Sequence, residues 1–386
     1  MIVLNYHSRK KITAEDQSTK DILERGFLGK PKKGNPTQLS IFEALYLADV
    51  RNAEIYYKGS KLSFNEIAGK FWKEKKFMAK YLTYKDWRDR GLIIKTPETK
   101  HKRPHSNPIK EYPSKKLSLH GYHFSGTFFI TDLVTVINRT EKAKEIYESF
   151  WFGQYGSYKA SDRGNLNKLD VYETLFLIEN GQLRLTNINK KRLIGELKSR
   201  HGQFGLLYSV YKDWRKNGYV VKTGFKFGTH FRIYFPGAKP FKAENGEWAH
   251  SRHVVHVFPR NSRLLISEWA RAIRVAHSVR KTFILAVPGK KNSRKTEIDF
   301  ILYHRRSGDS ENPNDNPPRY AMLSFGEEEF IGGAELASAI KEAKRLKIEL
   351  VIAIADRETA VTYYKIKQIK LKDSKAEYYE IDWIQP

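Results

Sequence analysis

The chain has 386 residues, enough for two to four domains, and 40% of them are hydrophobic, so sizeable cores can form. The absence of cysteine excludes disulfide bonds, thiolate zinc sites and a cysteine nucleophile. The sequence has no apolar run long enough to cross a membrane and no signal-peptide pattern, so we expect a cytoplasmic protein. A formal net charge of +27 and 13% aromatic residues favour a nucleic-acid partner, because cations contact phosphates and rings stack on unpaired bases.

The N-terminal half of the chain contains a repeat. Residues Leu39–Leu47 resemble Leu169–Leu177, and Tyr84–Thr96 resemble Tyr211–Thr223, at offsets of 130 and 127 residues. In each copy, apolar residues recur at helical spacing, and a glycine then leads into a short strand. We therefore predict two N-modules, each made of helices plus a small sheet.

The two N-modules differ in one loop. Gly29 is ten positions before Leu39, but Gly153 is sixteen positions before Leu169, so the second copy has about six extra residues. They could be a tolerated surface insertion. Alternatively, their cations Lys159 and Arg163 contact RNA, and we carry both as candidate RNA-binding residues.

The C-terminal half contains a second repeat. Residues Ala270–Val287 match Ala337–Ile354 at an offset of 67 without a gap, and each copy predicts a helix followed by a buried strand. These two C-modules of mixed α/β structure give the whole chain an α+β fold. The boundaries that we expect are a first N-module 1–98, a linker 99–116, a second N-module 117–222, a first C-module 223–306, a linker 307–318 and a second C-module 319–386. The two inner modules are expected to form one complete unit, and the outer two are expected to be half-units.

Three polar side chains are candidates for chemistry. Tyr234 ends a strand whose residues alternate in polarity, and His250 precedes an apolar strand, where His253 and His256 compete with it. Lys281 ends a helix predicted from about Ser267, which is its candidate N-cap. Taken singly, each of these residues is more often structural than catalytic.

The predicted helix carries a basic stripe. Arg271, Arg274, Ser278 and Lys281 fall at helical spacing on one face, apart from the apolar residues. Arg280 competes with Lys281 as the functional cation. A stripe of this kind is either a solvated face or a surface for RNA.

Three blocks taken together resemble archaeal tRNA-splicing endonucleases: Gly218–Tyr234, Ala249–Ser251 and Arg274–Lys281. The resemblance implies repeated two-domain units and a catalytic triad of Tyr234, His250 and Lys281 in the first C-module. It also implies cleavage of precursor tRNA at bulge–helix–bulge motifs without a metal or cofactor, leaving 2′,3′-cyclic phosphate and 5′-hydroxyl ends. Arg274, with Arg271 beside it, would stack on a bulge base.

The implied roles suit the side chains. Tyr234 would remove the proton of the ribose 2′-OH, and a neighbouring cation, Lys281, would lower its pKa from about 10. Protonated His250 would donate a proton to the leaving oxygen, and Lys281 would stabilise the charge on phosphorus.

The second C-module serves as an internal control. At the offset of 67, Pro317 stands in place of His250 and Ile348 in place of Lys281, and the run Phe-Arg-Ile-Tyr is missing. We therefore expect this module to be inactive, with one active site per chain. The resemblance further implies a homodimer in which an acidic loop, here with Asp356 and Glu358, docks on the partner, and the final residues 376–386 are expected at a subunit interface.

Two other functions fit less well. A non-catalytic RNA-binding scaffold of the same family would not need the intact triad. A metal-dependent DNA nuclease would need clustered carboxylates, which the sequence does not place near the basic helix. We therefore expect neither a metal site nor a DNA substrate.

Overall fold

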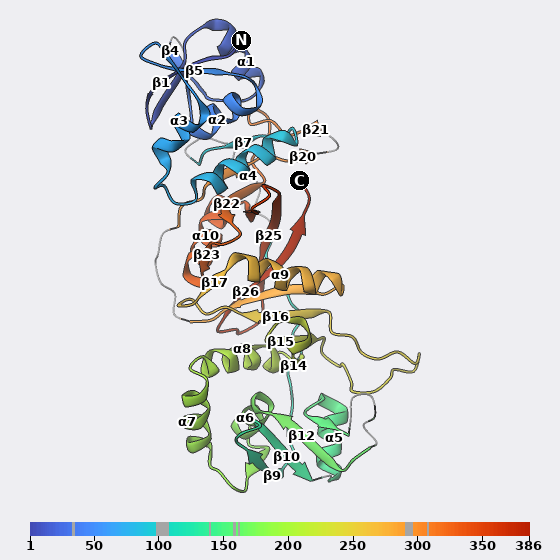
Figure 1. Cartoon of the computed structure of the whole chain (residues 1–386). Helices are drawn as coiled ribbons and strands as arrows, with labels where there is room; N and C mark the ends of the chain where they lie inside the picture. Colours follow the sequence, from blue (N-terminus) through green and yellow to red (C-terminus); the bar gives the residue numbers. More distant parts are fainter. Residues whose placement is uncertain are drawn as a thin grey trace.

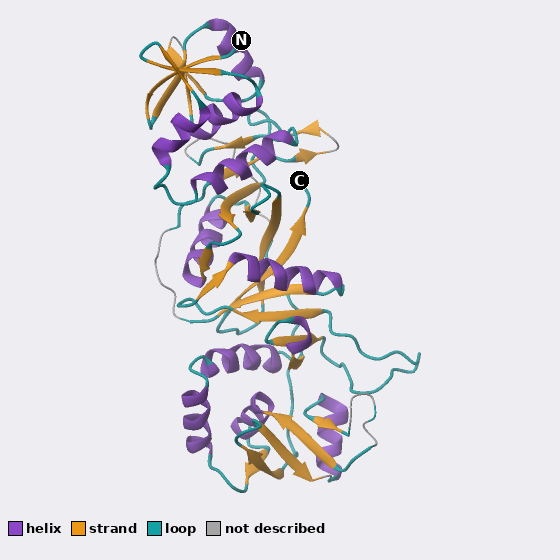
Figure 2. Cartoon of the chain, in the orientation of Figure 1, coloured by secondary structure: helices purple, strands orange, loops and turns teal. Residues whose placement is uncertain are grey.

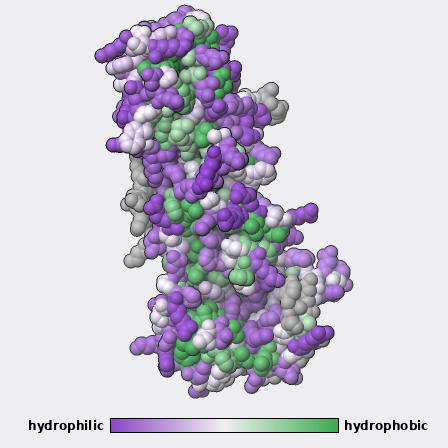
Figure 3. Space-filling model, viewed as in Figure 1, coloured by the Kyte–Doolittle hydropathy of each residue, from purple (hydrophilic) through white to green (hydrophobic). Residues whose placement is uncertain are grey.

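The computed structural model describes residues 1–32, 35–97, 108–138, 140–156, 160, 163–289, 296–306 and 309–386. Four bodies lie in a row in an elongated molecule: the first N-module, the second C-module, the first C-module and the second N-module (Figure 1). Helices and strands are mixed in every body, so the α+β class is confirmed (Figure 2). Hydrophilic residues cover most of the face drawn in Figure 3, with smaller apolar areas between them.

The two N-modules share one plan, a small mixed sheet covered by helices. The first consists of β1 (Val3–Ser8), β2 (Lys11–Ala14), α1 (Gln17–Arg25), β3 (Lys30–Lys32), β4 (Asn35–Leu39), α2 (Ile41–Val50), β5 (Glu54–Tyr57), β6 (Ser60–Leu62), α3 (Phe64–Ala68) and α4 (Phe77–Asp89). The second consists of β9 (Phe124–Phe129), β10 (Val134–Asn138), α5 (Glu141–Phe150), β11 (Gln154–Tyr155), β12 (Leu166–Asp170), α6 (Val171–Glu179), β13 (Leu183–Leu185), α7 (Lys190–Arg200) and α8 (Phe204–Lys216). Helices α2 and α6 both begin with a capping box, in which a side chain at the N-cap and a glutamate three residues later satisfy free backbone N–H groups.

One large sheet runs through both C-modules in the strand order β14-β15-β16-β18-β26-β25-β24-β22-β19-β7. Its strands are β7 (Ile94–Lys95), β14 (Val220–Thr223), β15 (Phe231–Tyr234), β16 (His253–Val257), β18 (Thr282–Val287), β19 (Phe300–Leu302), β22 (Tyr320–Gly326), β24 (Glu349–Ala355), β25 (Val361–Lys370) and β26 (Glu377–Ile384). The remaining elements are β8 (Lys110–Glu111), β17 (Arg263–Leu265), α9 (Ile266–Ser278), β20 (Arg305–Arg306), β21 (Asp309–Ser310), β23 (Phe330–Gly332), α10 (Gly333–Arg345) and the short turns η1 (Gly69–Phe71) and η2 (Phe225–Phe227).

The two C-modules are related by an approximate two-fold axis within the chain. Strands β17 and β23 pair antiparallel so that Leu264 faces Ile331, its own equivalent 67 residues later. The β26–β25 pair lies at the centre of the sheet. From this pair the sheet continues through β18, β16, β15 and β14 on one side and through their equivalents β24, β22, β19 and β7 on the other. The two modules are therefore halves of one body.

The first N-module packs on the second C-module, although about 200 residues separate them in the chain. Strand β7 extends the sheet at β19, and Thr83 and Ser324 share a hydrogen bond of 2.7 Å. The Tyr363 hydroxyl donates to Asp86 at 2.6 Å, and apolar side chains of both modules share one core. The two outer modules, each expected to be a half-unit, thus pack together into one body.

Three connecting segments also differ from expectation. Strand β19 lies within the expected first C-module but pairs with β22 of the second. The described end of the first linker contains β8, which pairs with β25, so this part of the linker is a strand of the large sheet. The C-terminal strand β26 pairs with β18 and β25 inside the chain, where we had expected a subunit interface. None of the helices in the described part of the chain has the length and hydropathy that crossing a bilayer requires.

Candidate active site

The register of three neighbouring strands brings Tyr234 and Lys281 to the same end of the sheet. His253 in β16 pairs with Ile233 on one side and with Thr282 on the other. Tyr234 and Lys281 are the next residues outward, so their backbones lie two strand spacings apart, about 10 Å. Long side chains bridge such a gap.

Tyr234 is buried more deeply than a half-buried strand predicts, with 5% of its surface exposed. The alternation is as expected: Phe231 and Ile233 enter the large core, while Tyr234 enters a small aromatic cluster on the other face. The Trp151 ring lies 4.8 Å from the Tyr234 ring at an angle of 45°, and the Arg232 guanidinium lies 5.7 Å from the same ring. The sequence analysis did not identify Trp151.

Lys281 is tied to the segment that carries His250. Its ammonium donates to the Ser251 carbonyl oxygen and, at 2.8 Å, to the Ser251 hydroxyl. Burial, with a smaller effect of the Arg232 charge, lowers the pKa of Lys281 from its usual value. The two cations therefore lie near one another, and Arg232 also lies beside the Tyr234 ring.

The helix before Lys281 is shorter than predicted. Helix α9 spans Ile266–Ser278, and its N-cap is Leu265 without a side-chain hydrogen bond, so Ser267 is not the cap. Arg280 has a φ of 54°, a left-handed conformation that turns the chain out of the helix. Arg280 is exposed, whereas Lys281 points to Ser251, which favours Lys281 as the functional cation.

His250 lies between two anchored neighbours. Ala249 packs against the aromatic cluster of Tyr234, and Ser251 accepts hydrogen bonds from Lys281. The His250 side chain is exposed. Its competitors are buried instead: burial lowers the pKa of His253 to about 4 and that of His256 to about 3, so both are neutral and inside the protein.

The candidate RNA-binding residues are exposed where the structure describes them. Arg271 and Arg274 lie on the exposed side of α9. Burial raises the pKa of Tyr364, and the positive charge of the nearby Arg274 opposes that shift. Arg163 is exposed in the loop between β11 and β12. Lys159 lies outside the described residues.

The acidic turn between β24 and β25 uses one of its carboxylates internally. Asp356 accepts hydrogen bonds from the backbone N–H groups of Glu358 and Ala360, both at 2.9 Å. Arg357 between them pairs with Glu328 at 2.6 Å. Asp356 therefore shapes the turn, and Glu358 is the exposed carboxylate.

The second C-module retains a tyrosine at the place of Tyr234. Strand β19 pairs with β22 and β7 as β15 pairs with β16 and β14, and this register puts Tyr303 at the equivalent position. The sequence repeat did not reveal this match, because its offset is 69 residues instead of 67. Tyr303 is fully buried, and Pro317 and Ile348 stand in place of His250 and Lys281, so those two positions have neither an imidazole nor an ammonium.

Among the described residues, no three histidine, aspartate or glutamate side chains gather closely enough to hold a metal ion. The groups at the Tyr234 end of the sheet are a phenol, an imidazole, an ammonium and a guanidinium. Such a set can remove one proton, donate another and stabilise an anion.

Two family models match the chain: the catalytic C-terminal domain of tRNA intron endonucleases over residues 204–297, and the N-terminal domain over residues 5–68. A tRNA-splicing endonuclease of Methanopyrus kandleri is 33% identical over 38% of this chain and 79% of its own length. That of Hyperthermus butylicus is 33% identical over 44% of this chain and 92% of its own. That of Methanococcoides burtonii is 25% identical over 72% of this chain and 94% of its own. On the strength of these matches and of the site geometry, the chain belongs to the archaeal tRNA-splicing endonuclease family.

Proposed function

We propose that this endonuclease cleaves precursor tRNA at bulge–helix–bulge splice sites by attack of the ribose 2′-OH on the adjacent phosphate. The products are a 2′,3′-cyclic phosphate and a 5′-hydroxyl, and no metal takes part. One observation carries the proposal. The strand register puts Tyr234 and Lys281 at one end of the sheet, and Lys281 holds Ser251, the residue next to His250.

Each side chain has one role in the proposed reaction. Tyr234 takes the 2′-OH proton, and a phenolate there would be stabilised by Arg232, 5.7 Å from its ring, and by Lys281, two strands away. Lys281 also stabilises the negative charge that develops on the pentacoordinate phosphorus. His250, exposed to the incoming RNA, donates a proton to the leaving 5′-oxygen.

The experiment is cleavage of a bulge–helix–bulge RNA in excess EDTA, with wild type beside His250→Ala. We expect two cuts with cyclic-phosphate ends, and a rate lower by a factor on the order of 10² or more in the variant. Wild-type activity that disappears with EDTA, or a variant as fast as wild type, would contradict the mechanism. RNA binding without any cleavage would favour a scaffold.

We further propose that two chains form a homodimer, because each chain offers one site and the substrate has two bulges. Exposed Glu358 contacts the partner, and the exposed Arg274 stacks on a bulge base. Light scattering should give twice the chain mass of 45.0 kDa, and a stable monomer at working concentration would contradict the dimer. Arg274→Ala should weaken cleavage, whereas Lys341→Ala, at the equivalent exposed position of the second C-module, should not.

A further inference from the structure

We propose that Trp151, a residue of the second N-module, is a positioning residue that holds the Tyr234 ring in the orientation its proton transfer requires. The inference rests on the proposed function, because Trp151 would act only through Tyr234. It also makes the active site a joint product of two modules. The family match to the catalytic domain begins at residue 204 and does not include Trp151.

The first step is the contact itself. The ring centroids of Trp151 and Tyr234 are 4.8 Å apart, and both side chains are buried, with 9% and 5% of their surfaces exposed. Tyr147 and Tyr155 of the second N-module belong to the same cluster, and Val220 faces Tyr234 across the β14–β15 pair. A ring held between such surfaces has little freedom to swing about its side-chain bonds.

The second step is that Trp151 is itself fixed. It caps the C-terminus of α5 with a φ of 51°, a left-handed conformation that bulky residues rarely adopt. Its backbone N–H donates to the Tyr147 carbonyl oxygen at 2.8 Å. The direction of the indole is thus set by the end of the helix.

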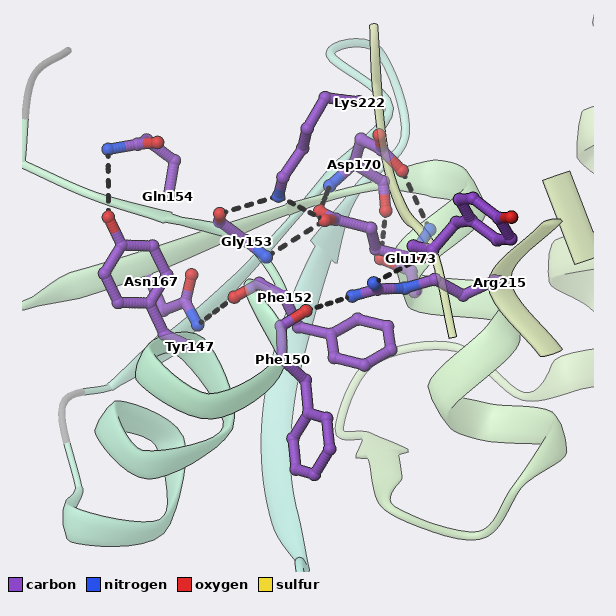
Figure 4. A network of polar contacts seen from close by, with 12 residues as sticks. Tyr147, Phe150, Phe152, Gly153, Gln154, Asn167, Asp170, Glu173, Arg215 and Lys222 are labelled. Atoms are coloured by element: carbon purple, nitrogen blue, oxygen red, sulfur yellow. Dashed lines mark hydrogen bonds and ion pairs between the residues drawn. The ribbon is translucent and has the colours of Figure 1, made fainter. Parts of the chain in front are cut away.

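The third step is a buried polar network around the neighbours of Trp151 (Figure 4). Arg215 donates to the Phe150 carbonyl oxygen at 2.6 Å, and Asn167 donates to that of Phe152 at 3.2 Å. Gly153 donates its N–H to Glu173 at 3.1 Å and accepts from Lys222 at 2.9 Å, while Lys222 and Glu173 form an ion pair of 2.6 Å. Residues on both sides of Trp151 are therefore held by charged side chains.

A simpler account is that this arrangement only docks an N-module on a C-module. The first N-module has a similar arrangement: Arg88 donates to the Gly26 carbonyl oxygen at 2.9 Å, and Gly29 donates to Glu43 at 2.9 Å. Between them Phe27 has the same φ of 51° and packs against the core that contains Tyr303. Because that half lacks the catalytic histidine and lysine, Phe27 is a matched control for docking.

The test compares single-turnover cleavage and RNA binding in variants at both positions, below the unfolding temperature of each. Trp151→Ala should lower the cleavage rate about 10- to 100-fold with the RNA dissociation constant unchanged, because misdirected catalytic groups lose rate more than binding. Trp151→Phe should recover most of the rate. Phe27→Ala should lower thermal stability but keep the wild-type rate.

A double variant separates this inference from the proposed function. If Trp151 acts through the Tyr234 hydroxyl, Trp151→Ala combined with Tyr234→Phe should be no slower than Tyr234→Phe alone. A Tyr234→Phe enzyme as fast as wild type overturns the proposed function itself. A slow Tyr234→Phe beside a Trp151→Ala enzyme that is fast, or slowed only as much as Phe27→Ala, overturns the positioning role alone.

A further variant covers the case in which Trp151→Ala does not fold. Trp151→Leu keeps an apolar side chain, closer in size to phenylalanine than alanine is, without a flat ring face. Cleavage by Trp151→Leu about tenfold slower than by Trp151→Phe supports the inference, and equal rates for the two overturn it.

Discussion

The histidines beside the candidate site show how one residue type divides between structure and chemistry. His253 and His256 belong to the same strand, and burial lowers the pKa of both, while His250 three residues earlier is exposed. The His256 ring also lies 4.6 Å from that of His230, whose pKa is likewise lowered by burial. Only the exposed histidine is placed to exchange a proton with a substrate.

This burial predicts sensitivity to acid. In the unfolded chain these histidines titrate near pH 6.5, whereas the folded pKa of His253 is about 4 and that of His256 about 3. As the pH falls below about 6.5 the unfolded state gains protons first, so stability falls by about 1.4 kcal/mol per pH unit and histidine. Thermal unfolding midpoints should therefore drop between pH 7 and 5.

The variant His256→Gln should show a smaller drop than wild type over the same pH range, because one of the titrating groups is gone. His120→Gln replaces an exposed histidine and should follow the wild-type curve. A midpoint that does not change between pH 7 and 5, or a His256→Gln curve as steep as wild type, would contradict this account.

At the residue scale the sequence singled out the candidate residues but not the side chains that surround them. The family motifs named Tyr234, His250 and Lys281, and the strand register puts Tyr234 and Lys281 at the same end of the sheet. Trp151 was missed because its role depends on a fold contact and not on a motif. Aligning the two N-modules on Gly29 and Gly153 would have found an aromatic residue two positions earlier in both copies.

At the scale of elements, each N-module has one buried ion pair that connects the start of a helix to a strand, and the glutamate of the pair also accepts a hydrogen bond from a loop glycine. Lys222 on β14 pairs with Glu173 on α6 at 2.6 Å, and Lys95 on β7 stands 3.9 Å from Glu43 on α2. Burial lowers the pKa of both lysines, and the facing glutamates oppose that shift. The duplication indicates that these charges are structural.

Removing one charge of such a pair should be costly. Lys222→Met would leave Glu173 buried without its cation, and we expect a loss of about 3–5 kcal/mol in unfolding free energy. Lys95→Met should cost less, because its pair is longer. Denaturant titrations of the two variants measure the difference, and equal losses, or a neutral Lys222→Met, would show that the ion pair is not what holds the module.

The helices of the N-modules were predictable, but the joins between modules were not. Apolar residues at helical spacing predicted α2, α4, α6 and α8, and a glycine after α4 and α8 predicted where those two helices end. The pairing of β7 with β19 and of β8 with β25 involves two residues from each of the N-terminal strands, and their partners lie more than 200 residues away. Such short strands carry no periodicity of their own, so only the assembled sheet reveals them.

At the scale of the whole molecule, one chain repeats the layout of a symmetric pair but has one set of candidate catalytic residues. Each half has an N-module, an aromatic residue in a left-handed turn and a tyrosine at the end of the facing strand, where Tyr234 is the last residue of β15 and Tyr303 directly follows β19. The half with Tyr303 has lost its histidine and lysine positions to Pro317 and Ile348. A substrate that must be cut twice therefore needs either two chains or two binding events.

This arrangement predicts the behaviour of a mixed dimer. A dimer that contains one wild-type chain and one His250→Ala chain, separated by different affinity tags, has one working site. In single turnover with excess enzyme it should give RNA cut at one splice site, with the excised intron appearing only after release and rebinding. A competitor RNA added after binding should therefore suppress the second cut in the mixed dimer and leave it intact in wild type. Excision of the intron by the mixed dimer despite the competitor would mean that one site reaches both bulges. The proposal that each chain of the dimer cuts one splice site would then be wrong.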